Sequence, residues 1–188
     1  MENRGENSKP YIFDQEMMVR FQRAGDLTRQ YNLTRESQRQ ERRDILAQLI
    51  GRLGSEVLIV PPFRCEYGDN IELEDRVVIN YNCTLMDNTT IRIGHDTLIG
   101  PNCSFYTVNH ALDPEERSQG WCVDHPIIIG NRVWLGGNVT VMAGVHIGDG
   151  SVIGAGSVVT RDIPGGVIAV GNPCRVLRKI TEADKLFK

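Results

Sequence analysis

The stretch IGNRVWLGGNVTVMAGVHIGDGSVIGAGSVVT, residues 129–160, decides the fold of this chain. A large aliphatic residue stands at every sixth position of it, namely Ile129, Leu135, Val141, Ile147, Ile153 and Val159. A period of six fits neither the roughly 3.6 residues per turn of an α-helix nor simple strand alternation. Hexapeptides of this kind predict a parallel β-helix, in which three short strands form one coil and the coils stack about 4.8 Å apart.

The same register extends towards the N-terminus. It runs through Tyr67, Leu73, Ile79, Leu85, Ile93, Ile99 and Phe105, with two extra residues after Leu85. Small or β-branched residues recur four positions later, and we expect them to point inwards too: Ile71, Val77, Cys83, Thr97, Cys103, Val133, Val139, Val145, Ser151 and Ser157. Because the insertion gives one coil twenty residues, Cys83 should stack on Cys103. A β-sandwich would not keep one register over two long runs.

Composition narrows the class of protein. A chain of 188 residues is one domain with an appendage, and its net charge of −3 gives no sign of a nucleic-acid partner. No apolar run reaches membrane-spanning length, so no membrane partner is expected. The five cysteines show no metal-like spacing, and reduced thiols in a cytoplasmic protein are predicted.

The chain divides into a mobile tail (1–10), a helical cap (11–56), the β-helix (57–170) and a C-terminal segment (171–188) with a short helix. In the cap we expect one helix over 11–24, ended near Gly25, and a second helix capped by Thr34. The apolar stripe of the second helix is Ile45, Leu46, Leu49, Ile50 and Leu53. Residues 110–126 break the repeat and are predicted to form an extruded loop, the kind of segment where function concentrates.

Several motifs lie on this framework, and their order and spacing connect the chain with a known family. They are PPFRCEYG (61–68), INYNCTLMDN (79–88), IGPNCSFYTVNHALDPEER (99–117), IGNRVWLGG (129–137) and VIGAGSVVTRDIPGGVIAVGNPCRVLRKI (152–180). With them the chain resembles the hexapeptide-repeat O-acetyltransferases of sugars, especially maltose, galactoside and nodulation acetyltransferases. The resemblance implies a left-handed β-helix, a homotrimer with active sites between neighbouring solenoids, and acetyl-CoA as the donor.

An alcohol that attacks a thioester needs a base, and histidine has a suitable pKa near neutrality. Of the four histidines, His95 and His146 fall at outward positions of the coils and His125 ends the loop. His110 stands at the mouth of the loop and aligns with the catalytic base of the family. The resemblance therefore implies direct acetyl transfer with His110 as general base.

Two further residues align with positions beside the reacting centre of the family. Gly137 would present a backbone N–H to the oxyanion, where the family often has serine. Asn80 would lie next to the reacting atoms, although an asparagine here could also be a turn residue of the coil.

Acceptor recognition is implied for Glu66, Asp87, Asn88 and Cys122. Asp87 could instead anchor the two-residue insertion, because a buried carboxylate must be paired. The cap segment after Ala24 and Gly25 is mostly neutral or basic, whereas the family commonly has acidic residues there. The identity of the acceptor therefore stays open.

Donor binding is implied at the coil edge and near the C-terminus. Gly136, Gly137 and Ala155 would let the pantetheine arm lie against backbone amides, and charged phosphates favour arginine. The aligned donor positions are Thr160, Arg161, Arg175 and Arg178. The same arginines could instead form a solvated basic C-terminus.

The leading hypothesis is a cytoplasmic, homotrimeric sugar O-acetyltransferase that needs no metal. A serine or antibiotic acetyltransferase of the same fold is one alternative, and a non-catalytic β-helix scaffold is another. A zinc β-helix like the γ-type carbonic anhydrases would need three histidines on facing coil edges. Only His110 is suitably placed.

Overall fold

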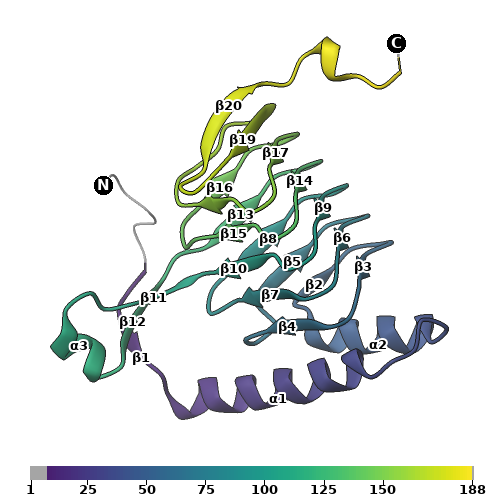
Figure 1. Cartoon of the computed structure of the whole chain (residues 1–188). Coiled ribbons are helices and arrows are strands. Elements are labelled where there is room, and N and C mark those ends of the chain that lie inside the picture. The colour runs from purple at the N-terminus through teal and green to yellow at the C-terminus, as the bar shows by residue number, and fades with distance from the viewer. Residues whose placement is uncertain (1–7, 188) are drawn as a thin grey trace.

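The computed structural model describes residues 8–187, which form a stack of parallel β-coils closed by two helices (Figure 1). Most of the tail expected over residues 1–10 lies outside the described part of the chain. The stack has three flat faces, each a sheet of strands from successive coils. The predicted mainly-β solenoid is therefore confirmed.

The strands of the three faces run in parallel register, with one exception at the C-terminus. Face 1 contains β2 (Arg52–Leu53), β5 (Ile71–Leu73), β8 (Ile91–Ile93), β13 (Ile127–Ile129) and β16 (His146–Ile147). Face 2 contains β3 (Leu58–Ile59), β6 (Val78–Ile79), β9 (Leu98–Ile99), β14 (Trp134–Leu135), β17 (Val152–Ile153), β19 (Val167–Val170) and β20 (Arg175–Lys179). Face 3 contains β4 (Phe63–Cys65), β7 (Cys83–Met86), β10 (Ser104–Tyr106), β15 (Thr140–Val141) and β18 (Val158–Val159).

The core is the pair of inward rows that the period of six predicted. Every residue of both rows is at most 2% exposed, so like residues stack on like from coil to coil. The pair Thr84↔Ser104 in β7 and β10 places Cys83 on Cys103, as expected from the insertion. Their thiols approach the carbonyl oxygens of Gly100 and Gly136, at 3.3 and 3.2 Å. All five cysteines are free thiols.

The first cap helix begins and ends later than expected, because Tyr11 and Ile12 form a strand instead. α1 spans Gln15–Asn32, begins with Asp14 accepting a hydrogen bond from Met17 N at 2.9 Å, and continues through Gly25. Its buried residues are Ala24, Thr28 and Tyr31, a helical spacing that packs one stripe onto the first coil. This packing outweighs the roughly 1 kcal/mol that a glycine costs within a helix, which explains why the helix does not end at Gly25.

The second cap helix begins later than expected. α2 spans Arg39–Leu49, and its capping residue, Gln38, makes no side-chain cap hydrogen bond. The Thr34 hydroxyl instead donates to the carbonyl of Tyr31 at 2.7 Å and accepts from Arg42. Thr34 therefore caps the C-terminal end of α1. Of the predicted apolar stripe, Ile45, Leu46 and Leu49 are buried on α2 and Ile50 is buried just after it, whereas Leu53 is half-buried and belongs to β2. Within residues 8–187, no helix has the length and apolar character required to cross a bilayer.

The segment expected to be an extruded loop is an ordered hairpin (Figure 1). β11 (Val108–His110) and β12 (Trp121–Asp124) pair antiparallel, and α3 (Pro114–Ser118) forms the tip. Asp113 caps α3 by accepting from two backbone N–H groups, which explains the Asp-Pro pair of the motif. β1 (Tyr11–Ile12) adds a third strand alongside β12.

The C-terminal segment turns back on the stack. β20 pairs antiparallel with β19, and the expected short helix is one 3-10 turn, η1 (Glu182–Asp184). Arg178 forms a bidentate ion pair with Asp184, at 2.8 and 2.7 Å, and this pair holds the turn against β20.

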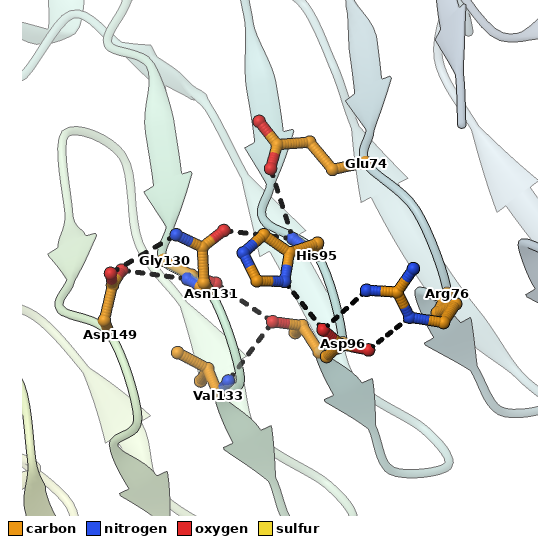
Figure 2. Close-up of polar contacts among 9 residues, drawn as sticks. Glu74, Arg76, His95, Asp96, Gly130, Asn131, Val133 and Asp149 are labelled. Carbon is orange, nitrogen blue, oxygen red and sulfur yellow. Dashed lines mark hydrogen bonds and ion pairs between the residues drawn. The ribbon is translucent and has the colours of Figure 1, made fainter. Parts of the chain in front are cut away.

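A polar ladder stabilises the corner between faces 1 and 2, which we call the ladder corner (Figure 2). The side chain of Asn131 accepts from His95 N at 3.1 Å and donates to Asp149 at 3.2 Å. Asp149 also accepts from Asn131 N at 2.9 Å, and Glu74 shares the His95 amide at 3.3 Å. Each coil is thus joined to the next one at this corner.

Candidate active site

The site residues expected from the sequence fall at two other corners. The corner between faces 2 and 3, which we call the Asn80 corner, holds Asn80, Gly136, Gly137 and Ala155. The corner between faces 3 and 1, which we call the hairpin corner, holds Glu66, Asp87, Asn88, His110, Cys122, Thr160 and Arg161. Face 3 separates them, and a strand the length of β7 spans about 13 Å. One chain therefore holds His110 and Asn80 at separate corners.

His110 ends β11 on the projecting hairpin, and its side chain is exposed. It lies directly opposite Cys122 in the antiparallel pair, so both side chains lie on one face of the hairpin. The distance from His110 Nδ1 to Cys122 Sγ is 3.2 Å. The Cys122 thiol can also donate to the carbonyl of Gly120, at 3.5 Å.

A half-buried polar pair supports the hairpin from β1. Tyr11 lies opposite Cys122 on the other side of β12, and its hydroxyl donates to Asp124 Oδ1 at 3.0 Å. Burial, followed by the charge of Asp124, raises the pKa of Tyr11 well above its usual value. Burial also raises the pKa values of Asp124 and Cys122. Burial therefore shifts each of these three groups towards its neutral form.

Asp87 is fully buried and holds the backbone of the hairpin corner. One carboxylate oxygen accepts from Glu66 N and Tyr67 N, both at 2.9 Å, and the other accepts from Asn70 N at 3.3 Å. Burial raises the pKa of Asp87 to about 6, although these backbone hydrogen bonds lower it. These contacts fit the alternative that Asp87 is an anchor.

Glu66 and Asn88 lie beside this anchor. Glu66 is half-buried, and the burial raises the pKa of its carboxyl. The side-chain oxygen of Asn88 is buried and has no hydrogen-bond partner within residues 8–187. Both side chains therefore have unused capacity for hydrogen bonds.

Sequence reasoning missed Tyr67 and Arg20 at the same corner. The Tyr67 hydroxyl is buried without a partner in the described part of the chain, and its ring lies 4.4 Å from the Arg20 guanidinium. Arg20 also forms a bidentate ion pair with Asp69. Burial raises the pKa of Tyr67 to about 12. The EYG triplet of the 61–68 motif was the one signal that could have pointed to Tyr67.

At the Asn80 corner, two N–H donors take no part in the hydrogen bonds of the described residues. Asn80 Oδ1 accepts from Tyr81 N at 2.9 Å, which leaves its amide NH₂ without a partner in the described residues. The Gly137 N–H likewise donates no hydrogen bond within residues 8–187, while its carbonyl accepts from Gly156 N. Both groups can donate to a bound molecule.

The two glycines of this corner have different surroundings. A Cβ on Gly136 would lie 2.7 Å from Ala155 N, so this position needs glycine. A Cβ on Gly137 would meet nothing nearer than Pro101 O, at 3.4 Å. A serine would therefore fit at position 137, and this chain does without its hydroxyl.

The arginines expected to bind the donor are exposed but not equivalent. Arg178 is committed to Asp184, as described above, and Arg175 donates to the carbonyl of Cys174 at 2.7 Å. Arg161 forms no ion pair within residues 8–187. No group of three His, Cys, Asp or Glu side chains in that range could hold a metal ion.

Comparisons with known proteins agree with this architecture. Residues 126–161 match the family model "Hexapeptide repeat of succinyl-transferase", and residues 7–54 match "Maltose acetyltransferase hexapeptide capping motif". The galactoside O-acetyltransferase of Escherichia coli strain K12 is 39% identical over 88% of this chain and 81% of its own length.

Two solved structures are similar over almost the whole chain. A maltose O-acetyltransferase from Clostridium difficile 630 is 41% identical, with a TM-score of 0.91, over 93% of this chain and 94% of that one. A hexapeptide-repeat acetyltransferase from Vibrio cholerae, solved with acetyl coenzyme A, is 37% identical, with a TM-score of 0.85, over 90% and 91%. This chain belongs to the hexapeptide-repeat acetyltransferases, together with the galactoside and maltose O-acetyltransferases.

Proposed function

We propose that the protein transfers an acetyl group from acetyl-CoA to a hydroxyl of a sugar or a similar small molecule. The observation that carries this proposal is the exposed His110 on an ordered hairpin of an acetyltransferase solenoid. The relatives named above act on galactosides and maltose, and the Vibrio cholerae protein binds acetyl coenzyme A. The acceptor of this chain is one that fits among Glu66, Asn88 and Tyr67.

The transfer needs one base and one oxyanion donor. His110 Nε2 takes the proton of the acceptor hydroxyl while its oxygen attacks the thioester carbonyl carbon. The negative charge that develops on the carbonyl oxygen is stabilised by the Gly137 N–H. The C–S bond then breaks, the acetyl ester is complete, and the imidazolium returns its proton to the leaving thiolate of coenzyme A.

We further propose that the enzyme is a homotrimer whose active sites lie between chains. The hairpin corner supplies His110 and the Asn80 corner of the next chain supplies Asn80 and Gly137. An apolar row on the outside of face 2 supports such an interface, because Leu58, Leu98 and Trp134 stack in register and are 48%, 49% and 54% exposed. Packing between chains would cover this row.

The remaining expected residues have supporting roles in this proposal. Gly136 and Ala155 border the pantetheine arm, and Thr160, Arg161 and Arg175 bind the phosphates of the donor. Arg178, which pairs with Asp184, holds the C-terminal turn beside them. Cys122 lines the acceptor side of the site together with Glu66, while Asp87 holds the backbone of the hairpin corner through its hydrogen bonds. Five free thiols are compatible with a cytoplasmic enzyme.

The activity is tested by following thiol release from acetyl-CoA across mono- and disaccharides, glucosamine, serine and streptogramin-type alcohols. Acceptor-dependent release is expected, with a sugar as the best acceptor. Release with serine or an antibiotic alone would instead favour the other transferases of this fold. Tight donor binding without release would mean an acceptor outside this panel, and neither binding nor release would favour the scaffold.

The shared site is tested by complementation between two inactive variants, His110→Ala and Asn80→Ala. If each site takes one residue from each of two chains, trimers reassembled from an equal mixture should regain up to about a quarter of the wild-type activity. A site built within one chain would give no recovery, because every chain would carry one defect. Trimers of either variant alone are the controls.

A further inference from the structure

The His110–Cys122 contact has a consequence for the base itself, given the proposed function. A neutral imidazole carries one proton, and which ring nitrogen carries it is set by the hydrogen bond at the other nitrogen. For Nε2 to accept the acceptor's proton, the proton of the resting ring must lie on Nδ1. Nδ1 is the atom that lies 3.2 Å from Cys122 Sγ.

We propose that Cys122 is a positioning residue that holds His110 in the Nδ1–H tautomer and so leaves Nε2 free to act as the base. The thiol proton points to the carbonyl of Gly120, 3.5 Å away, where sulfur can only donate. The sulfur lone pairs then face Nδ1, and Nδ1–H donates to them. The two hydrogen bonds together define the direction of both protons.

The hairpin keeps this pair in register. His110 and Cys122 are directly opposed in β11 and β12, and Tyr11 of β1 pairs with Cys122 from the other side. The titratable groups around the thiol are Asp124 on β12 and Tyr11 on β1, with Tyr67 near Tyr11 and His125 near Asp124. From α3, Glu116 lines the same cavity as Cys122, and Arg117 donates to the carbonyls of Ala111 and Leu112. Of these groups, Asp124 is the one whose charge acts on the pKa of the thiol.

A neutral thiol suits this role better than a thiolate. A thiolate beside the ring would stabilise the imidazolium, which has no lone pair with which to accept a proton. Burial, and then the charge of Asp124, raise the pKa of the Cys122 thiol. At neutral pH the sulfur therefore orients the base without protonating it.

The kinetic test uses three substitutions in the full-length enzyme. Cys122→Ala should lower kcat at least about tenfold with little change in the KM for acetyl-CoA, because a misplaced tautomer removes the base. Cys122→Ser should recover most of that loss, and Cys122→Asp should shift the acid limb of the pH–rate profile to higher pH. The control Val123→Ala, whose side chain lies on the opposite face of β12, should leave kcat and the pH profile unchanged.

The second measurement is the ¹⁵N spectrum of histidine-labelled enzyme, with His110 assigned from His110→Ala. The wild-type ring should show the Nδ1–H tautomer, and Cys122→Ala should shift it towards Nε2–H. Wild-type kcat, pH profile and tautomer in Cys122→Ala would overturn the positioning role while leaving the proposed function intact. Full activity of His110→Ala would instead overturn the base on which both proposals rest.

Discussion

The ladder corner and the projecting hairpin of β11 and β12 belong to the same solenoid but use polar side chains in opposite ways. At the ladder corner, the side chains of Asn131 and Asp149 form hydrogen bonds with residues of neighbouring coils (Figure 2). On the hairpin, His110 is exposed, and its Nδ1 lies 3.2 Å from the Cys122 thiol. Satisfied groups join coils to one another, whereas exposed groups on a supported hairpin are available for chemistry.

The pKa values of acidic side chains also differ between the two corners. At the ladder corner, Arg76 binds Asp96 at 2.6 and 2.8 Å, and this contact and the His95 ring hold the pKa of Asp96 well below its usual range (Figure 2). At the hairpin corner, burial raises the pKa values of Glu66 and Asp124. Raised acid pKa values at the corner that carries a candidate base are a common property of active sites.

The largest expected effect that separates the two corners is catalytic. His110→Ala should lower kcat about a hundredfold or more, since a positioned general base contributes at least that much. The urea midpoint should stay at the wild-type value, because the ring is exposed. Thiol release and urea unfolding measure the two quantities. A large loss of stability would show that His110 has a structural role.

The complementary change affects the ladder corner. Asn131→Ala removes two side-chain hydrogen bonds between coils and should lower the free energy of unfolding by about 1–2 kcal/mol. The folded variant should keep the wild-type kcat, and Asn138→Gly, at an exposed position of the Asn80 corner whose φ of 59° suits glycine, serves as the stability control. Equal unfolding curves for Asn131→Ala and wild type would mean that the ladder does not contribute to stability.

The smallest effect concerns the buried acid of the hairpin corner. The pKa of Asp87 is about 6 in the folded chain and about 3.9 when unfolded. As the pH rises from about 4 to about 6, the unfolded chain therefore loses this proton first, and the contribution of Asp87 to stability falls. Asp87→Asn is neutral throughout, so its stability relative to wild type should improve over this range in urea titrations. Parallel pH curves would contradict the raised pKa.

Much of the fold could be predicted because the repeat is local. The inward rows and the stacking of Cys83 on Cys103 follow from counting residues in sixes, since each strand pairs with the strand one coil later. The cap was harder to predict. Gly25 suggested a stop, but the burial of Ala24 and Thr28 on the first coil lies outside any local pattern.

The site was predictable as a set of residues and not as an arrangement. Motif alignment named His110 and Asn80 together, yet the three-sided cross-section holds them at different corners of one chain. The contact between His110 and Cys122 depends on the hairpin register, which residues 110–126 do not reveal because they leave the repeat. Tyr67 was missed because an aromatic residue at an inward position is indistinguishable from core packing.

The short strand β1 constrains the order in which parts of the molecule can fold. Successive coils pair with residues about one coil away, so the stack can grow as the chain leaves the ribosome. The Tyr11–Asp124 hydrogen bond joins residues 113 positions apart, and it cannot form until the hairpin has been synthesised. Closing so long a loop is entropically costly and comes late in folding. The N-terminal strand is therefore made first, and the support that it gives the hairpin can be completed only after residues 108–124 have been made.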